Sequence, residues 1–193
     1  EHFKTDDIDA LQLKHYSDIE AFFRRTLLAR AKKELDPIDE AWDNLIKNTI
    51  KDNGIKFNET NSRHVAALTD QVEALKQITS RKISILHGPA GTGKTTVLGA
   101  LFGCKELTKD GILLLAPTGK ARVKLGKMAG SEAFTIAQFL NRQKRFDWVR
   151  MKPKFTGTEK YKGEQNVIID ECSMLTEDDL YALLQSLDMG HVQ

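Results

Sequence analysis

A glycine-rich stretch between an apolar run and a helical pattern is the feature that most limits the possible folds of this chain. The run Ile83–Leu86 leads into HGPAGTGKTT at residues 87–96, and apolar residues at helical spacing follow. Short continuous apolar runs bounded by turn residues are typical of buried strands. We therefore expect a strand, a tight turn and a helix in succession, which is the beginning of an α/β unit.

The composition of this stretch favours a turn that holds phosphate groups. Gly91 and Gly93 let the backbone turn tightly and aim its N–H groups at one point, to which the following helix presents its positive end. Lys94 adds a cation for the terminal phosphates, and Thr95 adds a hydroxyl for Mg²⁺. We predict a nucleotide site formed by Gly88, Pro89, Ala90, Gly91, Thr92, Gly93, Lys94, Thr95 and Thr96.

Two more apolar runs extend the pattern into a sheet. Ile112–Ala116 and Val167–Ile169 are continuous rather than alternating, as expected of strands buried on both faces. Helical patterns separate the three runs, which predicts a parallel sheet. Asp170 and Glu171 follow the last run at the edge where ligands bind in open α/β sheets. Asp170 would hold Mg²⁺ through water, and Glu171 would activate the attacking water.

A basic helix is expected after the second strand. Pro117–Arg122 follows Ala116 at a turn, and further lysines continue the helical pattern. Thr118 and the first N–H groups of the helix could bind a phosphate of a nucleic acid backbone. An ordinary connection followed by a solvated basic helix explains these residues equally well.

The first sixty residues predict helices. Apolar residues recur at helical spacing from Asp6 onward, and Asp36-Pro37 predicts the start of a second helix that ends near Asn53-Gly54. Thr69 is expected to cap a third helix. Phe22-Phe23 are interpreted as core residues, and the basic pairs nearby as solvated faces.

Bulk properties exclude several classes of protein. The net charge of +2 among 193 residues is too small to indicate nucleic acid binding by itself. No apolar run reaches the length of a membrane span. Cys104 and Cys172 are too far apart to predict a zinc site or a disulfide framework. These properties predict a cytoplasmic protein with reduced thiols.

The stretch from about 141 to 165 mixes basic and aromatic residues. Such a mixture can form a platform for single-stranded nucleic acid. A solvated loop or small hairpin that packs its own aromatic residues is the favoured alternative.

Three segments together resemble a superfamily 1 DNA helicase of the RecD-like branch. GPAGTGKTT at 88–96 resembles its motif I, LLLAPTGKAR at 113–122 its motif Ia, and VIIDECSML at 167–175 its motif II, with Cys172 in place of the usual alanine. AFTIAQFL at 133–140 resembles a segment in which the family often has histidine where this chain has Ala137.

The resemblance implies a function and its residues. It implies an α/β fold, a partial RecA-like P-loop domain with a parallel sheet, behind a helical N-terminal region. It implies ATP and Mg²⁺ as cofactors, with Gln71 in LTDQVEAL reading the adenine edge. It implies single-stranded DNA as partner and ATP-driven unwinding as activity. The DNA contacts would be Pro117, Thr118, Gly119, Lys120 and Arg122.

The expected domain division places a helical region at 1–62 and the first RecA-like domain at 63–193, with the basic insert at about 141–165. The family's motif III strand, which lies between the P-loop strand and the Asp170 strand, is not found before Gln193. We therefore expect an N-terminal piece of a helicase, whose sheet should be unstable because flanking strands would lose their ladder partners. We expect it to bind ATP weakly and hydrolyse it poorly alone, because the arginine finger that the resemblance places in the second RecA-like domain is missing.

Two other functions stay open at this point. One is a P-loop ATPase that does not unwind nucleic acid. The other is a non-enzymatic module that recruits a protein partner through its N-terminal helices and carries a vestigial ATPase core. The intact Lys94, Thr95, Asp170 and Glu171 argue against the second.

Overall fold

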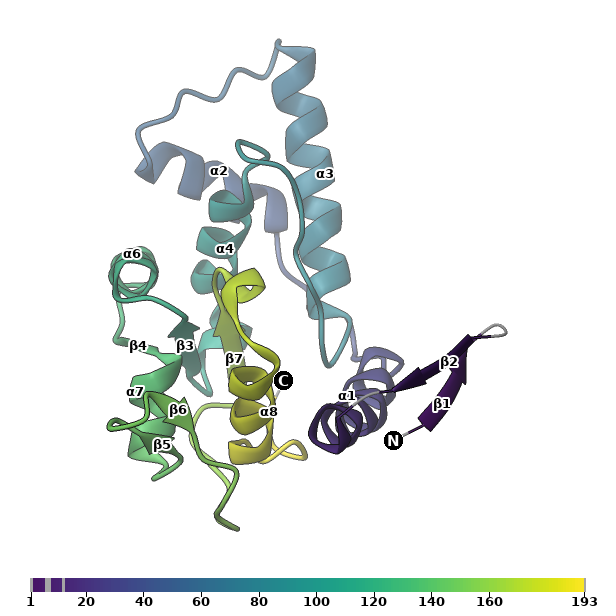
Figure 1. The fold of residues 1–193 in the computed structure, drawn as a ribbon. Coiled ribbons are helices and arrows are strands. Elements are labelled where there is room, and N and C mark those ends of the chain that lie inside the picture. Colours follow the sequence, from purple (N-terminus) through teal and green to yellow (C-terminus); the bar gives the residue numbers. More distant parts are fainter. Residues whose placement is uncertain (1, 6–7, 12, 193) are drawn as a thin grey trace.

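A three-stranded parallel sheet lies at the centre of the computed structural model, which describes residues 2–5, 8–11 and 13–192 (Figure 1). Its order is β4 (Ala133–Thr135), β3 (Ile112–Ala116) and β7 (Asn166–Ile169). Leu115 of the central strand pairs with Phe134 on one side and Ile169 on the other. The predicted parallel sheet and two of its three predicted strands are therefore confirmed.

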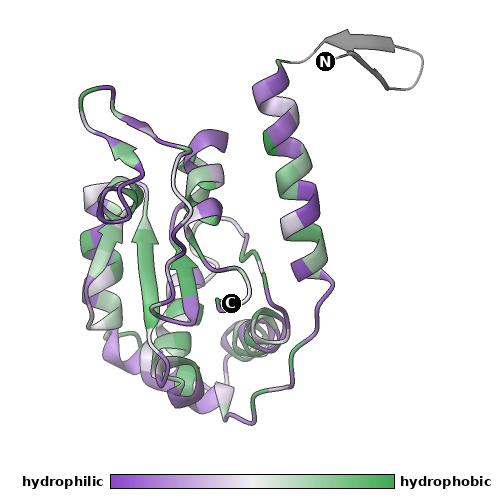
Figure 2. Cartoon of the chain, turned by 90° about the horizontal axis from the view of Figure 1, so that it is seen from below, coloured by the Kyte–Doolittle hydropathy of each residue, from purple (hydrophilic) through white to green (hydrophobic). Residues whose placement is uncertain are grey.

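Helices cover both faces of this sheet, as the continuous apolar runs predict. On one face, Leu113 and Leu115 pack against α7 (Ile136–Arg142) and α8 (Glu177–Ser186). On the other face, Leu114 packs against α6 (Gly119–Ala129) and the end of α4 (Lys94–Gly103). Figure 2 shows the mostly hydrophobic strands between these helices. Because both faces are covered, alternate residues of β3 are equally apolar.

The prediction of a third strand at Ile83–Leu86 is wrong. These residues have no strand pairing, and Ile85 is 82% exposed. Among the described strands, β7 pairs with β3 alone, so its second edge has no neighbour. A strand needs a ladder partner for its backbone groups, and no described strand lies beside residues 83–86.

A hairpin and a helix, rather than one helix from Asp6, form the beginning of the chain. β1 (His2–Thr5) pairs antiparallel with β2 (Ile8–Leu11), and α1 extends over Lys14–Ala31. Asp6 itself lies outside the described residues. The predicted helical start was wrong because cross-strand backbone pairing, which apolar spacing does not report, determines this segment.

Two further helix starts were also predicted wrongly. α2 covers Trp42–Asp52 instead of beginning at Pro37, and Trp42 is the first fully buried side chain of this segment, with 2% exposure. α3 covers Ser62–Thr79, and Asn61 caps it by accepting a hydrogen bond from the Arg63 N–H at 3.0 Å. The predicted cap, Thr69, lies inside α3. The predicted helix end near Asn53 is confirmed, since this residue is the C-cap of α2.

α2, α3 and α4 share one hydrophobic core beside the sheet (Figure 1). Its buried members come from all three helices and the residue that ends α4, and they are Trp42, Ile46, Leu75, Val97, Ala100, Leu101 and Cys104. At Gly99 the backbone of α4 comes close to α2, because a Cβ there would lie 2.5 Å from Cγ2 of Thr49. The N-terminal part of the chain thus directly supports the helix that follows the glycine-rich loop.

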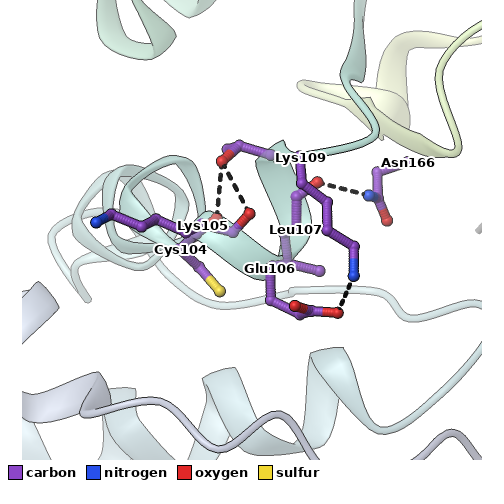
Figure 3. Close-up of polar contacts among 7 residues, drawn as sticks. Cys104, Lys105, Glu106, Leu107, Lys109 and Asn166 are labelled. Carbon is purple, nitrogen blue, oxygen red and sulfur yellow. Dashed lines mark hydrogen bonds and ion pairs between the residues drawn. The ribbon is translucent and has the colours of Figure 1, made fainter.

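A short helix, α5 (Lys105–Thr108), connects α4 to the sheet (Figure 3). The side-chain amide of Asn166 donates a hydrogen bond of 2.7 Å to the Leu107 carbonyl. Lys109 and Glu106 form an ion pair on the solvent side. The start of β7 is therefore attached to α5 by a bond between side chain and backbone.

The basic stretch contains a small hairpin of β5 (Phe146–Asp147) and β6 (Lys152–Pro153). Phe146 is buried, and its ring makes a T-shaped contact with Trp148, with centroids 4.8 Å apart. Arg145 is 2% exposed and donates hydrogen bonds to the carbonyls of Gly157 and Glu159. The small hairpin is therefore present, and Phe146 and Trp148 pack on each other, whereas Phe155 contacts Tyr181 of α8 and Tyr161 contacts Phe139 of α7.

α1 packs against α8 rather than against the sheet. Phe22 makes a T-shaped contact with Tyr181 at 4.9 Å, and both Phe22 and Phe23 are only half-buried, not core residues as predicted. His15 Nε2 lies 2.8 Å from Asp178 Oδ1. None of the described helices is long and apolar enough to cross a membrane.

Candidate nucleotide-binding site

Two glycines in the left-handed conformation shape the loop at residues 88–93. Gly91 has φ of +82° and Gly93 has φ of +85°. Glycine adopts this region freely because it has no Cβ, whereas other residues adopt it at a cost. Gly93 is also the N-cap of α4, so the loop passes directly into the helix. The loop and helix predicted from sequence are therefore formed even though the preceding strand is not.

The side chain of Lys94 folds back onto the loop. Its Nζ donates to the carbonyls of Gly88 at 2.6 Å and Pro89 at 2.7 Å. The hydroxyl of Thr92 donates to the same Pro89 carbonyl at 3.0 Å. Carbonyl oxygens here occupy positions around the ammonium group that more strongly accepting phosphate oxygens could take.

The backbone donors of the loop are free. Among the described residues, none accepts a hydrogen bond from the N–H groups of Ala90, Gly91, Thr92 or Gly93. Successive free N–H groups at a helix N-terminus form a site for an anion. The loop thus combines unsatisfied donors, a helix end and a cation, and these residues fit the triphosphate of a nucleotide.

Gln71 of α3 lies against the loop. A Cβ on Gly93 would lie 2.1 Å from the Nε2 atom of Gln71. The Oε1 atom of Gln71 is buried and has no hydrogen-bond partner. A buried acceptor without a partner costs free energy. This oxygen is therefore a candidate to accept a hydrogen bond from a donor group of a ligand.

Asp170 and Glu171 follow β7 at its carboxyl end, as predicted. The Asp170 N–H donates to the Leu115 carbonyl at 3.0 Å, which continues the ladder with β3. The Glu171 N–H donates to Oδ1 of Asp170 at 3.0 Å, and Glu171 has φ of +54°. A non-glycine residue in this region is uncommon and often lies at a functional site. The exposed Glu171 side chain therefore extends from a backbone in an uncommon, strained conformation.

The segment after β3 also begins a helix as predicted. Thr118 is the N-cap of α6, and its hydroxyl accepts a hydrogen bond of 3.2 Å from the Ala121 N–H. Lys120 is exposed in the first turn. Arg122 instead folds inward, where its Nη1 is 3.5 Å from the Ala133 carbonyl. Any anion at this end would meet the helix N–H groups and Lys120 rather than a free Thr118 hydroxyl.

Some of the predicted site residues lie close together in the structure, and others have no contact with them. Gln71, Gly93 and Lys94 form one group around the loop. No hydrogen bond or ion pair among the described residues connects Lys94 or Thr95 to Asp170 or Glu171. The described residues also contain no group of three acidic, histidine or cysteine side chains that could hold a metal ion. A metal here would need ligands from a nucleotide and water.

Sequence reasoning missed one residue of interest. Phe134 of β4 packs against the Arg142 guanidinium, whose Cζ lies 3.9 Å from the ring centroid. Its strand is short, and its partner comes from the end of α7. The two residues are eight positions apart in the chain, but periodicity does not report the turn from β4 into α7 that brings them together.

A model of the AAA domain family matches residues 67–192, which is more than half of the chain. This range includes the glycine-rich loop, the sheet and α8. An uncharacterized protein of Methanocaldococcus jannaschii is 29% identical over 206 aligned residues, which cover 96% of this chain and 17% of that protein.

Two further relatives carry names. An ATP-dependent RecD2 DNA helicase of Deinococcus radiodurans is 29% identical over 122 residues, 63% of this chain and 16% of that helicase. The ATP-dependent DNA helicase dda of Enterobacteria phage T4 is 41% identical over 68 residues, 34% of this chain and 16% of that helicase. The chain therefore spans about one sixth of the length of these curated relatives. It belongs to the AAA domain family, and its resemblance to RecD-like superfamily 1 helicases is confirmed.

Proposed function

We propose that this chain is the nucleotide-binding part of an ATP-dependent DNA helicase. In this proposal residues 88–95 are a Walker A motif, and Asp170-Glu171 belong to a Walker B motif. One observation carries it: two left-handed glycines leave free N–H groups beside Lys94 at the start of α4. The names of the relatives support DNA as the substrate.

Each residue of the site has a role in this proposal. ATP with Mg²⁺, when bound, supplies the phosphoryl group and a metal charge that polarises it. Gly91, Gly93 and Lys94 would hold the phosphates, while Thr95 and Asp170 would orient the metal, Asp170 through water. Glu171 would accept a proton from the attacking water. Its exposure and its uncommon backbone conformation directly after β7 support this role.

Gln71 would recognise the base. Its buried Oε1 has no partner in the chain, and the exocyclic amine of adenine is a donor that could satisfy it. This would make adenine nucleotides preferred over guanine nucleotides, which carry an acceptor at the corresponding position.

The DNA strand would pass over the N-terminus of α6. Pro117, Thr118, Gly119 and Lys120 lie at this turn, where helix N–H groups and an ammonium group attract phosphate. Arg122 folds inward towards the Ala133 carbonyl, so its side chain would have to turn outward to join these contacts. Such contacts position a strand without reading its sequence, as movement along DNA requires.

Binding of a fluorescent non-hydrolysable ATP analogue tests the proposal. With Mg²⁺ present, Lys94→Ala should weaken binding about tenfold or more, because a charge-assisted hydrogen bond is lost. Lys76→Ala, which removes an exposed lysine from α3, is the matched control and should bind normally. Equal binding by Lys94→Ala and the unchanged chain would contradict the site.

Unwinding needs a separate test on the whole protein. Strand displacement and DNA-stimulated ATP hydrolysis, both lost in Lys94→Ala, are the expected results. Hydrolysis that DNA does not stimulate would instead favour a P-loop ATPase that does not unwind.

A further inference from the structure

The two halves of the proposed nucleotide site come from separate parts of the chain. One half is the glycine-rich loop, which the chain enters from residues 83–86, and the other is Asp170-Glu171 after β7. α4 fixes the end of the loop, since Gly93 is its N-cap. No described strand pairs with residues 83–86, so the sheet does not fix the start of the loop relative to β7.

A connector between α1 and α2, residues 33–35, lies antiparallel to residues 80–82. Backbone N–H groups of each segment donate to carbonyls of the other, at 3.0 and 3.3 Å. Glu34 and Arg81 add an ion pair of 3.0 Å between Oε1 and Nη2. The connector therefore supplies backbone partners immediately before residues 83–86, where the sheet supplies none.

Arg30 of α1 joins this segment to the end of the chain that follows α8. Its guanidinium donates to the Lys82 carbonyl at 3.3 Å, and also to the carbonyls of Met189 and Val192. The side chain is half-buried, and this burial lowers the pKa of Arg30 because the charge loses solvent. In the described part of the chain no carboxylate forms an ion pair with it. The three carbonyls therefore hold this guanidinium, and it in turn holds their two segments together.

α1 is also attached directly to the half of the site that carries the acidic pair (Figure 1). α8 follows Asp170-Glu171 after a short 3₁₀ turn (Cys172–Met174). Phe22 of α1 contacts Tyr181 of α8 in a T-shaped arrangement, with ring centroids 4.9 Å apart. One helix thus contacts both the segment that enters the loop and the helix that follows the acidic pair.

We infer that α1 and the connector 33–35 form a brace that fixes the separation between the glycine-rich loop and Asp170, with Arg30 as its positioning residue. This inference rests on the proposed function, in which Thr95 and Asp170 orient the same metal ion. Two ligands on separate segments can do so only while the segments keep one separation. The N-terminal region then acts on the nucleotide site from outside it.

A distance between two spin labels tests the brace directly and without nucleotide. Cys172 is exposed directly after the acidic pair, Cys104 is buried, and Ile85 is 82% exposed. In the Ile85→Cys chain, labels therefore attach at positions 85 and 172. Pulsed electron paramagnetic resonance should give a narrow distance distribution, which Arg30→Met should broaden or shift. Arg25→Met is the matched control, because Arg25 is exposed on the same helix, and it should leave the distribution unchanged.

Nucleotide binding gives a second readout that a general loss of stability would not reproduce. With Mg²⁺ present, Arg30→Met should weaken binding of the ATP analogue about fivefold, the size of one ordinary hydrogen bond, because Asp170 is displaced. Without Mg²⁺ the variant and the unchanged chain should bind equally, since the loop alone holds the phosphates. Arg30→Lys should restore part of the Mg²⁺ effect, because an ammonium group still donates to carbonyls.

The remaining outcomes separate this inference from the proposed function. If circular dichroism shows that Arg30→Met does not fold, Phe22→Ala takes its place, since this half-buried ring attaches α1 to α8. An unchanged distance distribution in the folded variant overturns the brace, although the proposed function survives. Equal loss of affinity with and without Mg²⁺ also overturns it, because the loop itself is then altered. If no variant binds the analogue, the proposed function fails, and the label distances still decide whether α1 holds the two segments together.

Discussion

Replacing Gly99 with alanine tests how closely α2 packs against α4, the helix that follows the glycine-rich loop. Alanine is favoured over glycine inside a helix by roughly 0.5–1 kcal/mol. The new Cβ, however, would lie 2.5 Å from Thr49 Cγ2, and the Thr49 hydroxyl is fixed by a 2.9 Å bond to the Leu45 carbonyl. Overpacking of this kind costs about 1–3 kcal/mol. We expect Gly99→Ala to lower the free energy of unfolding by about 1 kcal/mol.

The effect of Gly99→Ala on the free energy of unfolding should change sign when Thr49 is replaced by alanine. In the Thr49→Ala background the nearest atom of that residue to the new Cβ is its own Cβ, at 3.6 Å, which is an ordinary contact. Gly99→Ala should then raise the free energy of unfolding by about 0.5–1 kcal/mol, through helix propensity alone. The coupling between the two substitutions is therefore about 2 kcal/mol.

Urea unfolding followed by far-ultraviolet circular dichroism measures all four members of this cycle. Thr49→Ala alone is the control for the loss of the threonine itself. If Gly99→Ala has the same sign and size in both backgrounds, α2 does not lie against α4 as described. The N-terminal helices would then not support the loop helix.

Three further predictions concern single side chains. In the whole protein, Glu171→Gln should bind ATP analogue normally yet hydrolyse ATP about a hundredfold more slowly, since proton acceptors contribute on this order. A steady-state phosphate-release assay with DNA measures this, and unchanged turnover would exclude Glu171 as the base. Burial, with the hydrogen bond to Glu164, raises the pKa of Tyr161 to about 12. The resulting stability is complete below about pH 10, where the unfolded phenol is still neutral, and is lost as pH rises towards 12. Tyr161→Phe should therefore flatten the alkaline decline seen in urea titrations, and an identical decline in both proteins would contradict this. Arg145→Met should cost about 2 kcal/mol in unfolding free energy, because two carbonyls lose a charged donor, whereas the exposed Arg150→Met should cost little.

The glycine-rich loop was predictable because its chemistry is local. Gly91 and Gly93 need their backbone angles, and Lys94 needs its place at a helix start, whatever the rest of the chain does. Asp170 and Glu171 were predictable for a similar reason, since a buried parallel strand places the residues after its last one at the carboxyl edge of the sheet.

The errors arose where distant parts of the chain decide the local structure. Ile83–Leu86 has the composition of a strand, but strand formation depends on a neighbour. Pro37 is suited to begin a helix, yet α2 begins only at Trp42, and the residues between them contribute the partly buried Ile38 to the core without forming a helix. The contact between Phe134 and Arg142 spans only eight residues, but it depends on how α7 turns back along β4, which apolar spacing does not report.

The free edge of β7 has a practical consequence for work with this chain. Apolar strand edges without a partner can pair with the same edge of another molecule and so begin aggregation. β7 has one open edge among the described strands, and Ile85 adds an exposed apolar side chain. The apparent molar mass measured by light scattering should therefore rise with protein concentration, and the binding experiments above belong at the lowest concentration that their signals allow.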